Sequence, residues 1–155
     1  MKALVASVFL IAACGSASAC DRSLAGIWKS DGARTMKFIR EDARLQSSAE
    51  QLLQALMGHM TLTFGESDLD VNMPDIEVTV AGDLRKFAGF NERKPYKVIF
   101  CGESTVVWSA KRSFGSVEET TTSNFVGPDT VWVYTGSTSP GVPDLHAREY
   151  FQRAR

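Results

Sequence analysis

Few of the side chains that usually carry enzyme chemistry stand at a useful spacing in this chain. Its 155 residues include two histidines, His59 and His146, which lie far apart in the sequence. Neither stands at a metal-ligand spacing such as His-x-x-x-His. The sequence also lacks a Gly-x-Ser-x-Gly elbow, a phosphate-binding loop and a dinucleotide fingerprint. We therefore expect a protein that is not an enzyme and that holds no metal ion or cofactor.

One pair of carboxylates has a spacing that catalysis could use. Asp68 and Asp70 alternate with Leu69, Val71 and Met73, so a strand would place both acids on one face, ~7 Å apart. Such a pair can support acid–base chemistry or bind a divalent cation. A solvated strand face produces the same spacing, and the three apolar residues fully account for the opposite face. We favour the solvated face.

The amino-terminal segment indicates export. A positively charged start is followed by an uncharged, mostly apolar run of eleven residues, 3–13. This run is too short to span a bilayer but matches the apolar part of a secretory signal. Cleavage after 17–19 (Ala-Ser-Ala) would make Cys20 the first mature residue, whereas a lipobox-like 11–15 would leave Cys14 lipidated. We favour a signal peptide at 1–19 and a periplasmic or secreted protein, with an envelope-anchored lipoprotein as the alternative.

Export leaves two cysteines to consider, Cys20 and Cys101. In an oxidising compartment these thiols most simply form one disulfide, because no Cys-x-x-Cys pair suggests a redox or metal role. The bridge would close a loop of about eighty residues, which the chain-entropy model values at ~4 kcal/mol. It would tie the mature amino terminus to the middle of the chain.

Composition favours a single globular domain at 20–155. The chain is 44% hydrophobic, and 17 basic residues nearly balance 18 acidic ones. A formal charge of −1 supplies no field for binding nucleic acid. The charges are nevertheless segregated, which either reflects cross-strand pairing or creates a basic rim that steers an anionic ligand. The acidic and basic groups are Glu66, Asp68, Asp70, Asp75 and Glu77, followed by Arg85, Lys86, Arg93, Lys94 and Lys97.

The dominant hydrophobic period of two predicts half-buried antiparallel strands. Turn-forming residues separate the strands, including an expected turn at 91–95. Beyond a first strand around Trp28, we expect strands at 35–40, 60–64, 68–73, 76–80, 84–90, 96–101, 105–110, 117–126, 130–135 and 146–153. About ten short strands with short connections suggest a meander closed into a barrel of eight to ten strands.

One segment has a helical period instead. Ser47 and Glu50 form a capping-box pattern, and Leu53 belongs to an apolar stripe that Gly58 would end. We expect one helix of about eleven residues. Its stripe would pack on the sheet or over the barrel mouth.

The start of the mature chain resembles a known family. Gly26-Ile27-Trp28 is similar to the Gly-x-Trp signature of lipocalin-like (calycin) barrels. The resemblance implies that Trp28 closes one end of the barrel and that an arginine late in the last strand packs across its ring. Arg153 fits this role best and Arg148 second. Gly26, Trp28 and Arg153 are therefore expected to form a structural plug in a divergent lipocalin-like barrel.

The same resemblance implies an exported, non-enzymatic protein that binds a small apolar or amphipathic molecule, such as a lipid. Barrels of this size can hold one such ligand. The alternative is a protein-binding module, for example an inhibitor or immunity protein that acts on a secreted enzyme through the loop 137–143. We expect no nucleic-acid partner and no transmembrane span.

Overall fold

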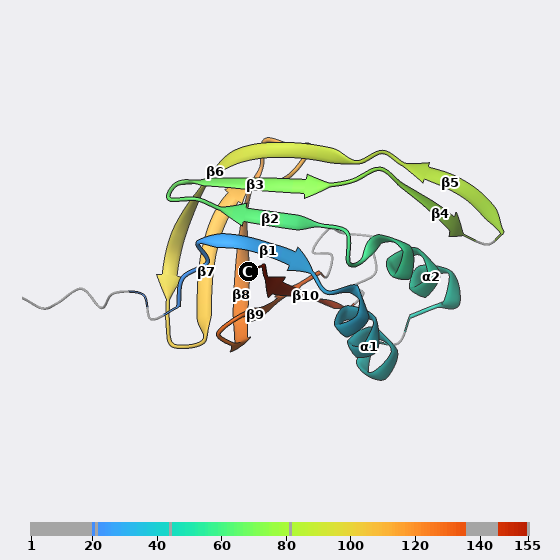
Figure 1. Ribbon diagram of the computed structural model, residues 1–155, viewed down its shortest axis with the longest axis horizontal. Coiled ribbons are helices and arrows are strands. Elements are labelled where there is room, and N and C mark those ends of the chain that lie inside the picture. Colours follow the sequence, from blue (N-terminus) through green and yellow to red (C-terminus); the bar gives the residue numbers. More distant parts are fainter. Residues whose placement is uncertain (1–19, 21, 44, 81, 136–145, 155) are drawn as a thin grey trace, which may run out of the picture.

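The computed structural model describes residues 20, 22–43, 45–80, 82–135 and 146–154. Within these ranges the chain forms mostly strands, together with two helices (Figure 1). In chain order the elements are β1 (Gly26–Ser30), α1 (Gly32–Asp42), α2 (Ser47–Leu56), β2 (Thr61–Phe64), β3 (Asp68–Met73), β4 (Ile76–Val80), β5 (Asp83–Phe87), β6 (Phe90–Cys101), β7 (Thr105–Lys111), β8 (Glu118–Gly127), β9 (Thr130–Tyr134) and β10 (Arg148–Arg153).

Eight of these strands form a closed antiparallel barrel in the order β1-β10-β9-β8-β7-β6-β3-β2. The first strand closes the ring, because Trp28 lies opposite Arg153 of β10 on one side and opposite Leu62 of β2 on the other. The predicted all-β barrel is thus confirmed, with eight strands. Closure leaves no unpaired edge in the ring.

The alternation of residue types explains which side of each strand faces inward. In β3, Leu69 and Val71 are buried while Asp68 and Asp70 are partly exposed. In β7, Val106 and Trp108 are likewise buried in the core. Successive side chains point to opposite faces of a strand, so each apolar set lies inside the barrel.

The prediction of a strand at 35–40, and of a single helix, is wrong. These residues belong to α1, whose first turn is capped when the Asp31 carboxylate accepts a hydrogen bond from the Arg34 amide at 3.0 Å. Met36 and Ile39 lie three residues apart on one helical face and are buried. Thr35 is also buried, and its hydroxyl accepts a hydrogen bond from the Tyr150 amide at 2.9 Å, which ties α1 to β10.

The second helix, α2, begins at the predicted residue but without the predicted cap. Its N-cap is Gln46, which makes no side-chain capping bond, and Glu50 instead accepts from Arg40 of α1 at 3.0 Å. Leu53 packs in a small cluster with α1 residues. The start of α1 approaches this helix closely, because a Cβ at Gly32 would lie 2.7 Å from the Met57 carbonyl. Only glycine therefore fits at position 32.

The turn expected at 91–95 is also wrong, because β6 runs through these residues without a break. Pro95 lies opposite Asp68, the first residue of β3, and pairing with β7 starts one residue later at Tyr96. The missing amide of Pro95 thus falls where one ladder ends and the next begins, which a strand tolerates.

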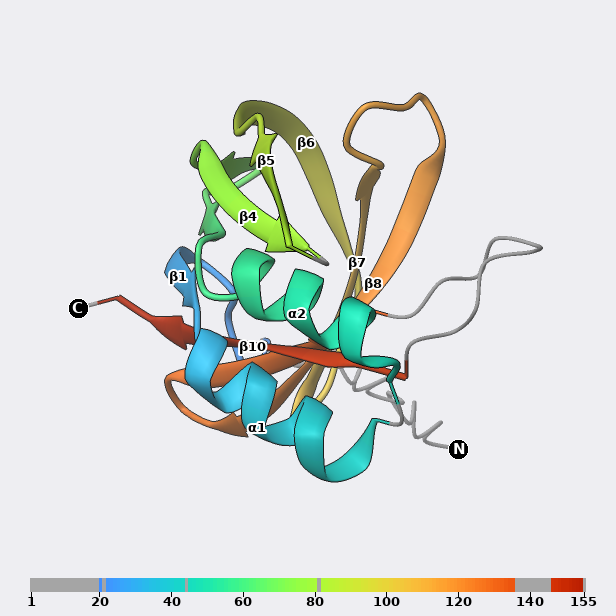
Figure 2. The same cartoon turned by 90° about the vertical axis from the view of Figure 1, so that its right-hand side faces the viewer.

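The strands β4 and β5 do not join the barrel. They form a separate two-stranded sheet that extends from β3 and β6 beyond the ring, as Figure 1 shows. Helix α2 packs on β4 and on α1. In Figure 2 both helices and this hairpin face the viewer on the same side of the molecule.

Candidate functional site

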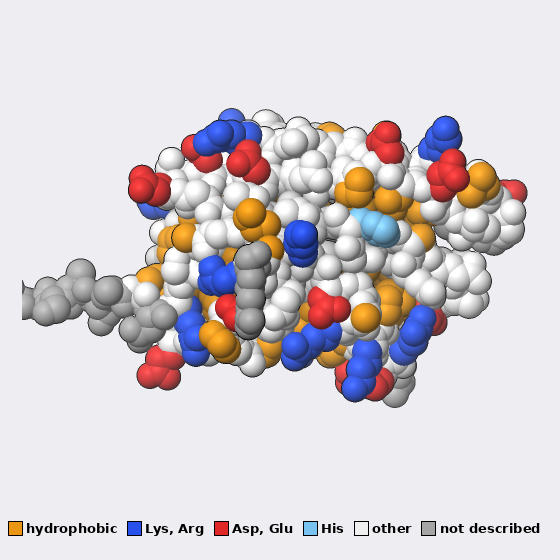
Figure 3. Space-filling model, in the orientation of Figure 1, with side chains coloured by type: hydrophobic (Ala, Val, Ile, Leu, Met, Phe, Trp, Pro, Cys, Tyr) orange, Lys and Arg blue, Asp and Glu red, His pale blue; other side chains and the backbone are white. Residues whose placement is uncertain are grey.

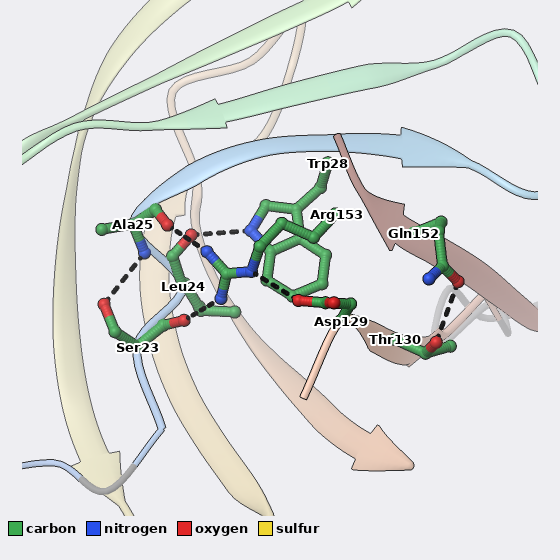
Figure 4. Close-up of polar contacts among 8 residues, drawn as sticks. All are labelled: Ser23, Leu24, Ala25, Trp28, Asp129, Thr130, Gln152 and Arg153. Atoms are coloured by element: carbon green, nitrogen blue, oxygen red, sulfur yellow. Dashed lines mark hydrogen bonds and ion pairs between the residues drawn. The ribbon is translucent and has the colours of Figure 1, made fainter. Parts of the chain in front are cut away.

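One end of the barrel is closed by Trp28, whose side chain is fully buried. The guanidinium carbon of Arg153 lies 4.2 Å from the Trp28 ring centroid, and the indole nitrogen donates to the Leu24 carbonyl at 2.7 Å (Figure 4). The edge of the Phe125 ring meets the indole at a centroid distance of 5.9 Å. Aromatic burial and a cation–π contact therefore stabilise this end together.

The arginine at this end is held on several sides. Its guanidinium donates to the carbonyls of Ala25 and Ser23, and its Nε lies 3.6 Å from an Asp129 carboxylate oxygen (Figure 4). Gly26 has a φ of 117°, and a Cβ there would lie 3.1 Å from Arg153 Nη1. A side chain at position 26 would therefore be strained and would crowd the arginine.

The disulfide between Cys20 and Cys101 is present, with the two Cα atoms 5.6 Å apart. It joins the segment before β1 to the end of β6, close to the closed end of the barrel, where Cys101 packs against the main core. Cys14 and the rest of the expected signal, 1–19, lie outside the described residues.

The opposite end of the barrel contains a cavity of about 380 Å³. Its apolar walls come from several strands of the barrel and include Met60, Leu62, Leu69, Val71, Trp108 and Phe151. A smaller cavity of about 140 Å³ continues between the barrel, α2 and the β4–β5 hairpin. Apolar walls with a few polar groups are typical of sites for small ligands.

On one wall of the larger cavity stands a buried lysine, Lys94, which is only 9% exposed. It faces inward because its Cα pairs with that of the buried Leu69. The ammonium group lies 3.4 Å from a carboxylate oxygen of Glu92 and donates to the Ser113 hydroxyl at 3.0 Å. Its charge is therefore compensated within the protein.

A buried acid, Glu149, lines both cavities and is 6% exposed. Its Oε1 lies 2.6 Å from the Ser30 hydroxyl oxygen, which also accepts from the Gly58 amide at 2.9 Å. Burial raises the pKa of the Glu149 carboxyl, and the hydrogen bond from Ser30 only partly offsets this. Among the described residues no cation pairs with it, so no neighbouring positive charge offsets the effect of burial, which favours the uncharged form relative to an exposed glutamate.

A third polar group faces the same cavity. The hydroxyl of Thr135 is the one buried side-chain N or O atom without a hydrogen-bond partner in the part of the chain that the structure describes. Buried polar atoms are normally paired, because an unmade hydrogen bond costs about 1–3 kcal/mol. A ligand that bonded to this hydroxyl would remove that cost.

The carboxylate pair singled out in the sequence lies outside this cavity. Arg93 approaches Asp68 at 3.1 Å and Asp70 at 3.9 Å, and all three side chains are substantially exposed. These are cross-strand pairs, the first of the two explanations for the segregated charges. On the face drawn in Figure 3, acidic and basic side chains are interspersed and form no large patch of a single charge.

The remaining candidate residues lie apart from one another. His59 is exposed beside the end of α2, and His146 precedes β10. Arg148, the second choice for the plug, lies on the outer surface, where its guanidinium carbon is 4.2 Å from the Trp132 ring and 4.6 Å from the Phe38 ring. The loop 137–143 lies outside the described residues.

Sequence reasoning missed the roles of Glu149 and Ser30, and it counted Lys94 only as part of a basic run. One signal was available for Glu149. It is two residues from Phe151 and four from Arg153, so the inward position of Arg153 also implied an inward acid. The same period would have placed Lys94 on the face of Tyr96, but the turn expected at 91–95 separated the two residues.

Among the described residues, no group of three or more His, Cys, Asp or Glu side chains is arranged to hold a metal ion. None of the helices described is long and apolar enough to cross a membrane. No protein-family model matches the chain, and no curated protein or solved structure is significantly similar to it. What is shown is therefore the fold: an eight-stranded closed antiparallel barrel with one plugged end and one hollow end.

Proposed function

We propose that this protein binds a small apolar or amphipathic molecule in the hollow end of its barrel. The observation that carries the proposal is the cavity of about 380 Å³, which has apolar walls and a few inward-facing polar groups. Ligand sites commonly fall within ~300–1,000 Å³. The plug around Trp28 supports a single entrance, because it fills the other end of the barrel.

The proposal includes export from the cytoplasm and a distant relationship to lipocalin-like barrels. Export is supported by the signal-like sequence at 1–19 and by the Cys20–Cys101 disulfide, since disulfides persist mainly in oxidising compartments. The relationship is supported by the Gly-x-Trp pattern at the start of a closed barrel and by the arginine that lies across the tryptophan.

A displacement assay with a fluorescent fatty acid tests ligand binding directly. Ala110 lines the cavity from β7, so Ala110→Phe should fill the space and abolish binding. Val107→Phe adds an aromatic ring on the outward face of the same strand, where Val107 pairs with the exposed Phe100, and should bind as the wild type does. Equal loss in both variants would indicate general damage to the barrel.

Native mass spectrometry of the processed protein provides a second measurement. A co-purified lipid or small hydrophobic molecule would support the proposal. If the wild type bound no apolar probe and co-purified with no such molecule, the proposed function would be wrong. The alternative, a protein-binding module that acts on a secreted enzyme, would then be the function to test.

A further inference from the structure

We propose that the ligand carries an uncharged hydrogen-bond acceptor, a carbonyl or hydroxyl oxygen, that binds Glu149 beside Thr135. This inference rests on the proposed function, because it names the ligand class of the same cavity. It predicts weaker binding for ligands whose polar group is a carboxylate or an ammonium. Three observations carry it: the hydrogen bonds of Glu149, the unpaired hydroxyl of Thr135 and the charge balance of the cavity.

The first observation determines which oxygen of Glu149 carries the proton. The Gly58 amide donates to the Ser30 hydroxyl oxygen at 2.9 Å, which leaves the hydroxyl hydrogen free to be donated to Glu149 Oε1 at 2.6 Å. Oε1 therefore acts as an acceptor, and the acid proton belongs on Oε2. Among the described residues Oε2 has no hydrogen-bond partner, so this donor is available to a ligand in the cavity that Glu149 lines.

The second observation places another polar group next to this donor. Glu149 lies opposite Val133, and the Thr135 amide donates to the Ala147 carbonyl at 2.9 Å, so Thr135 and Glu149 are diagonal neighbours across β9 and β10. Diagonal neighbours on one face are ~7–8 Å apart, a separation that one polar group and its attached chain can span. The unpaired Thr135 hydroxyl would then gain a partner from the same ligand.

The third observation is that the charged groups around the cavity already compensate one another. Lys94 pairs with Glu92 at 3.4 Å, and Arg112 pairs with Glu119 at 3.1 Å. The other basic group in the lining, Lys111, is exposed. A charged ligand group would lose its hydration without gaining an uncompensated buried partner, which is unfavourable. An uncharged polar group avoids this cost.

Four probes of equal chain length test the ligand class: decanamide, decanol, decanoate and decylamine, each used to displace an uncharged fluorescent fatty alcohol near neutral pH. We expect the amide and the alcohol to bind roughly tenfold more tightly than the two charged probes. Equal binding of all four would overturn this inference and leave the proposed function standing. Failure of every probe to bind would overturn the proposed function itself.

Variants at position 149 test the assigned partner. Glu149→Gln remains uncharged and keeps a donor, so it should bind decanamide as the wild type does, whereas Glu149→Leu should bind it roughly tenfold more weakly. Thr121→Val removes a hydroxyl elsewhere in the lining and serves as the matched control. Unchanged decanamide binding by a folded Glu149→Leu would overturn the assignment. If Glu149→Leu fails to fold, the pH dependence of Glu149→Gln still tests it.

The pH dependence of binding separates a hydrogen-bond donor from a structural residue when the probe is N,N-dimethyldecanamide, whose carbonyl oxygen accepts but which has no N–H to donate to an ionised carboxylate. Wild-type affinity should fall as the pH rises through the raised pKa of Glu149, because the ionised carboxylate can no longer donate. Glu149→Gln should lose this dependence. That variant retains the other charged groups that line the cavity, Lys94, Lys111, Arg112 and Glu119, and also Glu92, the ion-pair partner of Lys94. The same pH dependence in both proteins would overturn the proposal.

Discussion

The two ends of the barrel are built on the same strands but satisfy their polar groups very differently. At the closed end, the Trp28 indole nitrogen bonds to Leu24, and the Arg153 guanidinium has carbonyl and carboxylate partners. At the hollow end, Thr135 has an unpaired hydroxyl and Glu149 is a buried acid with one hydrogen bond. The polar groups at the closed end are satisfied by the protein itself, whereas those at the hollow end could still bond to a ligand.

A short piece of sequence separates these two environments. Glu149, Phe151 and Arg153 alternate along one face of β10, so Glu149 lies ~13 Å from Arg153 at the usual rise of a strand. Trp28 of β1 lies directly opposite Arg153, whereas Ser30, two residues later, lies opposite Phe151 and donates diagonally to Glu149. The single strand pair β1–β10 therefore carries both the plug at the closed end and the polar pair Ser30–Glu149 at the hollow end.

The largest effect is expected at the closed end. Trp28→Ala should lower the free energy of unfolding by ~3–5 kcal/mol, because a closed ring of strands cannot collapse into the space of a lost indole. Chemical denaturation measures the change. Trp132→Ala, which removes an indole that is only partly buried, is the matched control and should cost less. An equal cost at the two positions would contradict the special role of the closed end.

Loss of the disulfide should have the next largest effect. The Cys20→Ser, Cys101→Ser double variant should be destabilised by ~2–4 kcal/mol, since the bridge restricts a long loop of the unfolded chain. Thermal unfolding measures the loss, and non-reducing peptide mapping of the wild type checks the pairing. Ligand binding by the folded variant should be unchanged, because neither cysteine lines the cavity. Two free thiols in protein purified under oxidising conditions would refute the pairing.

Removal of the arginine should cost less than removal of the tryptophan. The cation–π contact of Arg153 is worth ~0.5–2 kcal/mol, and Arg153→Ala also removes its hydrogen bonds to backbone carbonyls. A double-mutant cycle with Trp28→Ala should show coupling, because the two side chains touch. Strictly additive free energies would show that the two side chains stabilise the barrel independently. Under the proposed function, neither variant should alter the ranking of ligands, because the cavity lies at the other end.

The smallest effect on stability is expected from Glu149→Gln, and it should depend on pH. The folded-state pKa of Glu149 is raised above its unfolded value, so the wild type binds more protons when folded between the two pKa values. Its stability should therefore fall as the pH rises through that interval. Glu149→Gln should lack this part of the slope and gain stability relative to the wild type at higher pH. Denaturant titrations across the pH range measure both curves, and identical slopes would contradict a buried, protonated acid.

Much of the fold could be predicted from local patterns. The alternation in β3 and β7 identified strands because their inward residues are uniformly apolar. The strand predicted at 35–40 is wrong, because the helical cap is Asp31, one residue before a glycine, and the apolar face of the helix depends on contact with α2 and Ala147. The sequence predicted a break in β6 because proline favours turns. In the structure Pro95 lies where the ladder with β3 ends and the ladder with β7 begins, and only the strand pairing shows this.

The amino-acid sequence by itself determined the strand period and indicated the pairing of Cys20 with Cys101, because both depend on residue type and order along the chain. The residues of the plug followed from the resemblance of the Gly26-Ile27-Trp28 pattern to lipocalin-like barrels. Only the tertiary structure decided where the cavity lies and which polar groups face it. Lys94 and Glu149 come from β6 and β10, which are not neighbours in the ring. Because the sheet curves and closes, the inward faces of these two strands line the same cavity. No local sequence pattern specifies that Lys94 and Glu149 share a cavity.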